Sequence, residues 1–294
     1  MKLLFYISIT LAVAGGLLFP ALGAFSGLIP VMIAGMLFIN FLDAKIDMAH
    51  VFRKELLITF FLTVFFMPFI THNLLSIWFE APYRVGLLLV ACAPTGVMGI
   101  ILIRYLQHRD FHLAFSNFLF STFGSILVIP FVLKLFLGET APIESRPILI
   151  QTAALIIIPY IATRLVERFC RKTLQQSIKK TAVFLTPVVV FMIVSTTIAS
   201  ASDDLKWNMT LLSLSSCVFA IYLLQGSLGY LAGYLLRKRD IKNTLALIAS
   251  SRNCQIILAV AILNFSPLTA VPIIIATIFH HLMNAIWLWV LQRN

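Results

Sequence analysis

Ten apolar stretches divide this chain, and each has about the length at which a helix crosses a membrane. A hydrocarbon core about 30 Å thick requires roughly 20 apolar residues per helix. The stretches cover residues 3–22, 27–44, 56–72, 84–104, 112–137, 147–166, 181–200, 208–236, 243–263 and 266–291. With 61% hydrophobic and only 11% charged residues, the composition excludes an ordinary soluble domain. We therefore expect an all-α polytopic membrane protein with ten transmembrane helices.

The first stretch, Leu3 to Leu22, has the appearance of a secretory signal peptide, with Lys2 before it and small residues after it. We interpret it as a retained membrane helix, because it is long enough to span and a second apolar stretch follows at once.

Lys and Arg are distributed unequally between the loops on the two sides of the predicted membrane. Every second loop is rich in them, whereas the opposite loops contain only Arg84, Arg146 and Lys206. The positive-inside rule then places both termini in the cytoplasm, with the protein in the plasma membrane, in bacteria the inner membrane. The same pattern accounts for the net charge of +11 without a nucleic-acid partner, since the basic loops are short and flank apolar spans.

The spans form two sets of five, residues 1–138 and 139–294, which together make one integral-membrane domain. Because five is odd, the second set enters the membrane from the opposite side, which predicts two inverted-topology repeats. Spans four and nine are then equivalent. Both are interrupted, span four by Ala93-Pro-Thr-Gly96 and span nine by the polar run around Arg252. Paired broken helices of this kind, with Pro94 as the break in span four, indicate a binding site near the midplane.

Arg252 is the residue in span nine that most needs an explanation, because a cation at membrane depth costs roughly 2.5–3.5 kcal/mol even on lenient scales. We predict that it binds an anionic substrate, assisted by the N-termini of two half-helices. The alternative is that it donates to backbone carbonyls of the broken span and to Asn253, or reaches into a water-filled cavity.

Further polar residues are candidates for lining the site. Beyond Arg252, the predicted substrate-binding residues are Thr95, Gly96, Ser121, Ser125, Asn253 and Gln255. Ser116 and Thr122 are weaker candidates for ion coupling, and His281, three residues before Asn284, for proton coupling. Each could instead form an ordinary interhelical hydrogen bond. No metal site is expected, because no third ligand lies at suitable spacing.

Several segments resemble the bile acid/sodium symporter family. Leu87 to Gly96 with the following loop to Asp110 resembles the crossing helix four of that family, and Phe120 to Pro130 resembles helix five. Phe66-Met-Pro68 is similar to the end of helix three, and Leu258-Ala-Val-Ala261 to the stretch after the helix-nine motif. The resemblance covers essentially the whole chain and implies a secondary transporter that works by alternating access.

Departures from the family pattern concern its sodium ligands. After the break in span four, Val97-Met-Gly-Ile100 offers no side-chain oxygen. The acidic ligand of helix nine falls on Ser250 in one alignment, with Cys254 and Gln255 at the amide pair. In the other it falls on Ile248, with Arg252 and Asn253 at the pair. We therefore hypothesise that Arg252 supplies the positive charge that sodium supplies in relatives, and regard Ser250 as a weak coupling candidate.

The preferred interpretation is a transporter of small organic anions with no cofactor and with doubtful sodium coupling. The alternatives are an ordinary sodium-coupled symporter of bile-acid type, an arsenite or oxyanion exporter with Cys92 as a soft ligand, and a non-catalytic membrane assembly subunit. An enzyme is not expected, because the apolar interior of the spans contains no acid and no nucleophile–base arrangement. The expected partners are the small anion and the lipid bilayer, and the sequence does not define an oligomeric state.

Overall fold

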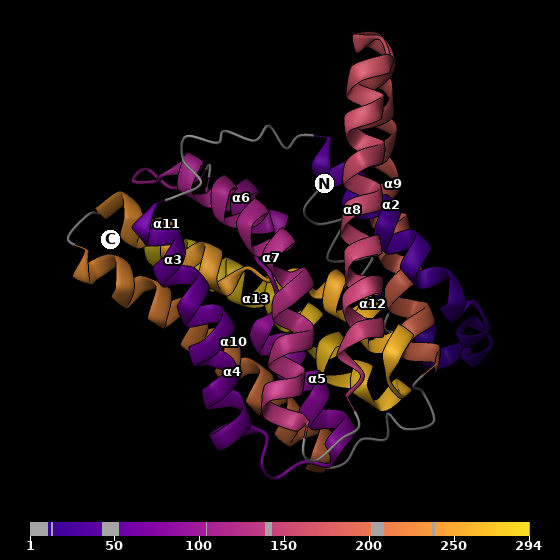
Figure 1. Cartoon of the computed structure of the whole chain (residues 1–294), viewed down its shortest axis with the longest axis vertical. Helices are drawn as coiled ribbons and strands as arrows, with labels where there is room; N and C mark the ends of the chain where they lie inside the picture. The colour runs from indigo at the N-terminus through magenta and orange to yellow at the C-terminus, as the bar shows by residue number, and fades with distance from the viewer. Residues whose placement is uncertain are drawn as a thin grey trace.

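The computed structural model describes residues 11–293 apart from 13, 43–52, 104, 139–142, 201–208 and 237–238. Within these residues every element is a helix, and the only β pairing is one isolated bridge. Figure 1 shows the helices gathered into one bundle, from which α8 and α9 extend furthest. The predictions that fall outside the described residues concern the start of the first span and the loop residues Lys2, Lys45, Arg104, Lys206, Arg237 and Lys238.

In the described part of the chain, six helical segments are long and apolar enough to cross a membrane, which confirms the polytopic class. Their elements are η1 (Pro20–Leu28) with α2 (Ile29–Phe41); α3 (Lys54–Phe61) with η3 (Leu62–Phe66), α4 (Met67–Ile70) and η4 (Thr71–Leu75); α7 (Phe111–Leu137); α8 (Ser145–Phe169); α10 (Met209–Leu235); and η5 (Pro267–Ala270) with α13 (Val271–Arg293). The helix α9 (Lys172–Ser200) adds a shorter apolar part, Phe191–Ser200.

The connection predicted between spans one and two differs from expectation. Residues 23–26 do not form an open loop, because η1 is a 3-10 helix that runs directly into α2. The physical reason is the composition of Pro20–Leu28, which is almost entirely apolar. A segment without polar side chains satisfies its backbone best through its own hydrogen bonds.

The third span contains two π-helical turns that the sequence pattern did not predict, η3 and η4, on either side of α4. Pro68 lies in α4 between them. Proline lacks an N–H and its ring clashes with the preceding turn, so the helix widens around it. The span stays helical from Lys54 to Leu75 and is not kinked into two separate helices.

Spans four and nine are divided into half-helices, as predicted. Span four consists of α5 (Ala81–Cys92) and α6 (Val97–Ile103), and span nine of α11 (Arg239–Ser250) and α12 (Cys254–Asn264). Most residues of α5, α11 and α12 are buried, so these segments form the interior of the bundle. The close approach of α11 to α10 depends on glycine: a Cβ at Gly233 would lie 2.2 Å from Cα of Lys242.

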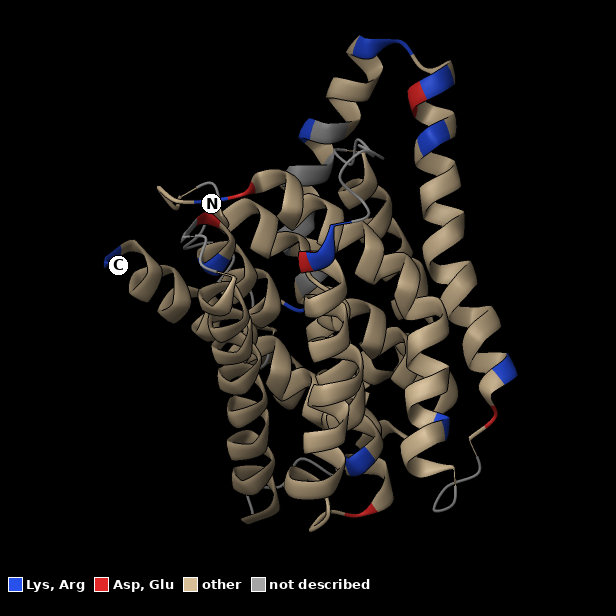
Figure 2. Cartoon of the chain, turned by 60° about the vertical axis from the view of Figure 1, so that its left-hand side comes forward, with Lys and Arg blue, Asp and Glu red and all other residues tan. Residues whose placement is uncertain are grey.

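Charged side chains lie mainly at the ends of the bundle (Figure 2). More of the drawn Lys and Arg residues lie toward the end where α8 and α9 project than toward the opposite end. Arg252 is the exception among the described basic residues, because it lies in the interior and is only 2% exposed.

Candidate functional site

The two chain breaks meet each other in the interior and pair through their backbones. Thr95 and Arg252 form an isolated antiparallel bridge. The amide of Gly96 donates to the carbonyl of Ser251 at 2.8 Å, and the amide of Asn253 donates to the carbonyl of Pro94 at 2.8 Å. These bonds satisfy groups that the interrupted helices leave without partners, which lipid could not supply.

Side chains of α7 support the first break. The amide of Thr95 donates to Oγ of Ser121 at 3.0 Å, and Nδ2 of Asn117 donates to Oγ1 of Thr95 at 2.7 Å. All three residues are buried. The backbone of the break is therefore held from two sides, by the second break and by α7.

The guanidinium of Arg252 has two protein acceptors. Its Nε donates to Oε1 of Gln225 on α10 at 3.0 Å, and its Nη1 donates to the carbonyl of Ala93 at 3.1 Å. Gln225 in turn donates from Nε2 to the carbonyl of Ala91 at 3.0 Å. Arg252 and Gln225 together bind carbonyls at the C-terminal end of α5.

This placement corrects the expected surroundings of Arg252. We expected the guanidinium beside two half-helix N-termini, but it contacts the C-terminal end of α5. The physical reason is the helix dipole, because the unpaired carbonyls at a helix C-terminus carry partial negative charge and attract a cation. The expected alternative, donation to backbone carbonyls, is present, although the carbonyl belongs to the other broken span.

The helix end does not use all of the donors of Arg252. Its Nη2 is buried and has no hydrogen-bond partner. No carboxylate in the described part of the chain forms an ion pair with it, and the buried carboxylate among these residues, Glu55, lies beside Arg53 at 3.5 Å. A full positive charge is thus offset by partial charges only, and one guanidinium nitrogen remains available.

A second polar group adjoins the crossing through α13. The amide of Arg252 donates to Nδ1 of His280 at 3.2 Å, and Nε2 of His280 lies 3.1 Å from Nδ2 of Asn284. The spacing of three residues between His281 and Asn284 allows these two side chains to lie on one face of the helix. Residues four apart share a helix face more closely here, and His280 is the histidine that reaches both the break and Asn284.

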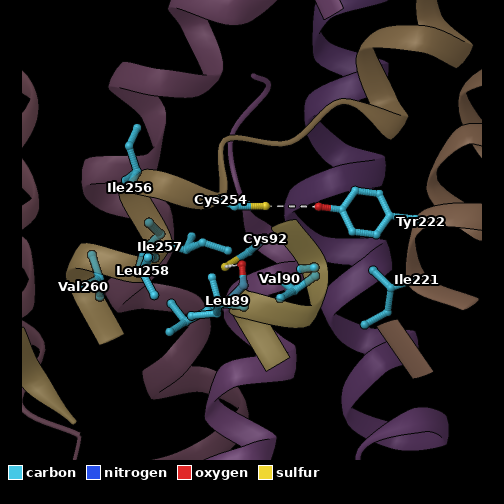
Figure 3. Close-up of a cluster of buried hydrophobic side chains, with 14 of the residues drawn as sticks. Leu89, Val90, Cys92, Ile221, Tyr222, Cys254, Ile256, Ile257, Leu258 and Val260 are labelled. Atoms are coloured by element: carbon cyan, nitrogen blue, oxygen red, sulfur yellow. Dashed lines mark hydrogen bonds between the residues drawn. The ribbon is translucent and has the colours of Figure 1, made fainter. Parts of the chain in front are cut away.

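Tyr222 on α10 completes this group. Its hydroxyl lies 3.2 Å from Sγ of Cys254, the first residue of α12, as Figure 3 shows. The ring of Tyr222 also packs edge-on against His280, with 6.2 Å between ring centroids. Cys92 lies at the end of α5 in the same view, and its Sγ donates to the carbonyl of Leu89 in its own helix.

The structure brings only part of the predicted site together. Pro94, Thr95, Gly96, Ser121, Arg252 and Asn253 meet at the crossing, where Asn253 also caps α12 through the amide of Ile256 at 3.4 Å. Ser125 and Ser250 donate to carbonyls of their own helices. Gln255 donates to Sδ of Met36 on α2 at 3.3 Å and points away from the crossing. Ser116 and Thr122 are buried on α7, and Oγ1 of Thr122 has no hydrogen-bond partner.

Gln225 is the participant that the sequence reasoning missed. It is 1% exposed and contacts both Arg252 and the end of α5. The available signal was an amide side chain in the middle of the apolar stretch 208–236, far from Asn208 at its start. An isolated amide in a membrane span requires a partner, and the unpaired Arg252 was the obvious one.

A polar cavity of about 610 Å³ lies away from the crossing, at the start of α3, α7 and α11. Arg53 bridges its wall by an ion pair with Asp110 at 2.5 Å. Burial tends to raise the pKa of the Asp110 carboxyl, but the amide of Leu113 and the Arg53 guanidinium outweigh it and lower that pKa. This cavity is separate from the candidate site.

Comparison with known proteins decides the family. A family model described as the sodium bile acid symporter family matches residues 25–208, more than half of the chain. The chain belongs to this family. It is a family of transporters and not of enzymes, so the protein is a multi-pass membrane transporter.

Individual relatives are distant from this family member. It is 26% identical to the uncharacterized sodium-dependent transporter YocS of Bacillus subtilis over 74% of its own length and 68% of that protein. It is 27% identical to sodium/bile acid cotransporter 7 of Danio rerio over 53% of its length, and spans less than half, 46%, of that protein. A probable sodium/metabolite cotransporter, BASS2, from Oryza sativa is 28% identical over 35% of the chain and 24% of that protein.

Proposed function

We propose that this family member is a secondary transporter of small organic anions whose crossing site attracts the anion with the fixed charge of Arg252. The observation that carries the proposal is the buried guanidinium with one unpartnered nitrogen and no carboxylate counter-ion among the described residues. An uncompensated buried charge is unfavourable, and a bound anion is the partner that removes the imbalance.

The chemistry of the guanidinium defines the class of anion. Its planar set of donors suits the oxygens of a carboxylate, a sulfonate or a phosphate. Since Nε and Nη1 already donate to Gln225 and Ala93, the nitrogen without a partner is Nη2, which favours an anion that approaches in the plane of the guanidinium at its Nη2 edge. The surrounding break adds hydroxyl and amide groups from Thr95, Ser121 and Asn117.

Sodium coupling at this crossing is the second candidate, and the names of the relatives favour it. Those names describe sodium-dependent or sodium/bile acid transport by the relatives themselves. Against it, the crossing holds an arginine where a hard cation would require several oxygens, commonly with a carboxylate among them. Electrostatic repulsion from Arg252 opposes a sodium ion placed beside it.

We propose that the protein has ten membrane spans in two inverted repeats, residues 1–138 and 139–294. It would lie in the plasma membrane, in bacteria the inner membrane, with both termini in the cytoplasm. The support for this architecture is the division of spans four and nine at matching positions and the unequal distribution of Lys and Arg between loops. Transport would proceed by alternating access around the crossing.

The test measures thermal stabilisation of the detergent-purified protein by benzoate, methanesulfonate and taurocholate, each as sodium and as choline salt. A ligand that binds the folded state raises the apparent Tm by mass action. We expect an anion-dependent rise that is equal in sodium and choline and absent in Arg252→Gln. A rise that requires sodium and persists in Arg252→Gln would establish the second candidate.

A further inference from the structure

His280 is a titratable group at the crossing that the proposed anion site does not use. It is 6% exposed on α13, and its Nδ1 accepts a hydrogen bond from the backbone amide of Arg252 at 3.2 Å. A neutral imidazole accepts at one nitrogen only, so its single hydrogen is on Nε2, 3.1 Å from the side-chain amide of Asn284. Because an amide nitrogen does not accept, this tautomer requires the Asn284 amide to be turned by about 180°, so that its otherwise unpartnered Oδ1 accepts from Nε2. The contact with Arg252 thus requires His280 to be neutral.

Protonation of His280 would change this contact directly. A proton from water would add to the lone pair of Nδ1, and the imidazolium would then donate at both nitrogens. The hydrogen bond from the amide of Arg252 would be lost, which leaves that amide free to bind another acceptor. One O–H bond of a hydronium ion is broken and one N–H bond at Nδ1 is formed, a water molecule leaves, and the charge of the site increases by one.

Among the residues that the structure describes, the surroundings of His280 offer no anion to balance that charge. The titratable or charged groups that face it are Tyr222 from α10, Arg252 from the second break and His281 on its own helix. The thiols of Cys254 on α12 and Cys92 on α5 lie near Tyr222 and Arg252. None of these is a carboxylate, so a protonated His280 would place two cations together in the interior.

We infer that His280 binds a proton together with the substrate anion, so that the transporter couples the two at one site. An anion beside Arg252 offsets the charge of imidazolium, and imidazolium releases the Arg252 amide as a further donor for the anion. By linkage, each ligand then raises the affinity of the other by the same factor. The inference rests on the proposed anion site, and it makes the movement of a monovalent anion electrically neutral.

The experiment is calorimetric titration of the purified full chain with benzoate and taurocholate in choline buffers. Each titration is repeated in two buffers with different ionisation enthalpies, and the difference in the measured binding enthalpy gives the number of protons taken up per anion. The pH values run from 5.5 to 8, the range in which histidine titrates. We expect uptake that approaches one proton per anion, with the Kd increasing by up to about tenfold per pH unit toward high pH. His280→Gln is expected to bind without proton uptake and without pH dependence.

His281→Gln is the matched control, because it makes the same substitution one position along α13, at a residue that does not accept from Arg252. It is expected to retain the proton uptake of the wild type. Anion binding by wild type with no proton uptake would overturn the inference and leave the anion site intact, even if His280→Gln failed to fold. If the wild type binds neither benzoate nor taurocholate, both the proposed anion site and the proton coupling are overturned.

Discussion

Thr95 and Arg252 pair as extended residues in antiparallel orientation, although one belongs to each of the two broken spans. The pairing replaces helical hydrogen bonds with bonds between the breaks, from Gly96 to Ser251 and from Asn253 to Pro94. Because backbone hydrogen bonds hold the two breaks together, the side chains at the crossing remain available for other contacts. Arg252 uses that freedom to reach α5 and α10.

Gly96→Ala is expected to disrupt the crossing. A Cβ at this position would lie 2.8 Å from the carbonyl oxygen of Arg252 and 3.0 Å from its carbonyl carbon, and both are backbone atoms held by the bridge. Overpacking of this kind costs about 1–3 kcal/mol, and each kcal/mol lowers Tm by roughly 2–4 °C in a protein of 150–250 residues. Thermal unfolding in detergent measures the change.

Gly35→Ala is the matched control for that substitution, since a methyl group at this position on α2 would meet no heavy atom within 4 Å beyond its chain neighbours and the nearby backbone of its own helix. It is expected to leave Tm unchanged or slightly higher, because alanine favours a helix more than glycine does. Equal losses of stability in the two variants would contradict the close approach of the breaks.

Gln225→Glu is expected to remove anion binding while the protein stays folded. The new carboxylate would lie 3.0 Å from Nε of Arg252, where the amide oxygen lies now, and would supply an internal counter-ion. Anion-dependent stabilisation would then disappear. Gln225→Ala, in contrast, leaves Nε of Arg252 and the carbonyl of Ala91 without the partners that Gln225 provides, and is expected to lower Tm. Normal anion stabilisation in Gln225→Glu would contradict the proposed role of Arg252.

Much of the fold could be predicted from the sequence, because apolar length alone determines where a helix can span a membrane. The two breaks were also predictable. Pro94 lacks an amide hydrogen and Arg252 carries a charge, so neither residue fits a continuous helix in lipid. The direction of the Arg252 side chain was not predictable, because it depends on which helix end lies opposite, and this is a property of tertiary packing.

The same limitation explains why the contacts of His280 with Arg252 and Asn284, and the position of Gln255, were not predicted. Adjacent histidines on a helix point about 100° apart, and periodicity does not say which of them faces the core when the helix is apolar all round. Gln255 is adjacent to the break in sequence but faces α2. The π-turns around Pro68 and the helical η1 depend on backbone hydrogen bonding, and the hydrophobic pattern carries no direct signal for them.

The Arg53–Asp110 ion pair, which lies at the start of α3 and α7, is expected to make the stability of the folded protein depend on pH. The pKa of Asp110 is lowered in the folded protein, so its contribution is present above its ordinary pKa of 3.8 and is lost as pH falls below that value. Asp110→Asn retains a good capping residue for α7 but removes the ion pair. We expect a lower Tm than wild type at pH 7 and a smaller difference as pH falls below 3.8.

Asp240→Asn is the control for this pH effect, because its carboxylate is 58% exposed and faces His108 at 3.3 Å. An exposed pair contributes little to stability, so Tm should stay close to that of wild type. A larger decrease in Tm for Asp240→Asn than for Asp110→Asn would contradict the stabilising role given to the Arg53–Asp110 pair.

The most direct test of the central claim is uptake of labelled benzoate and taurocholate into proteoliposomes in choline buffer, with wild type, Arg252→Lys and Arg252→Gln. We predict uptake without sodium by wild type and reduced uptake by the lysine variant, which keeps the charge but not the planar set of donors. The glutamine variant is predicted to show none. Uptake by wild type that requires sodium, together with normal uptake by Arg252→Gln, would contradict the claim that Arg252 is the built-in cation of this transporter.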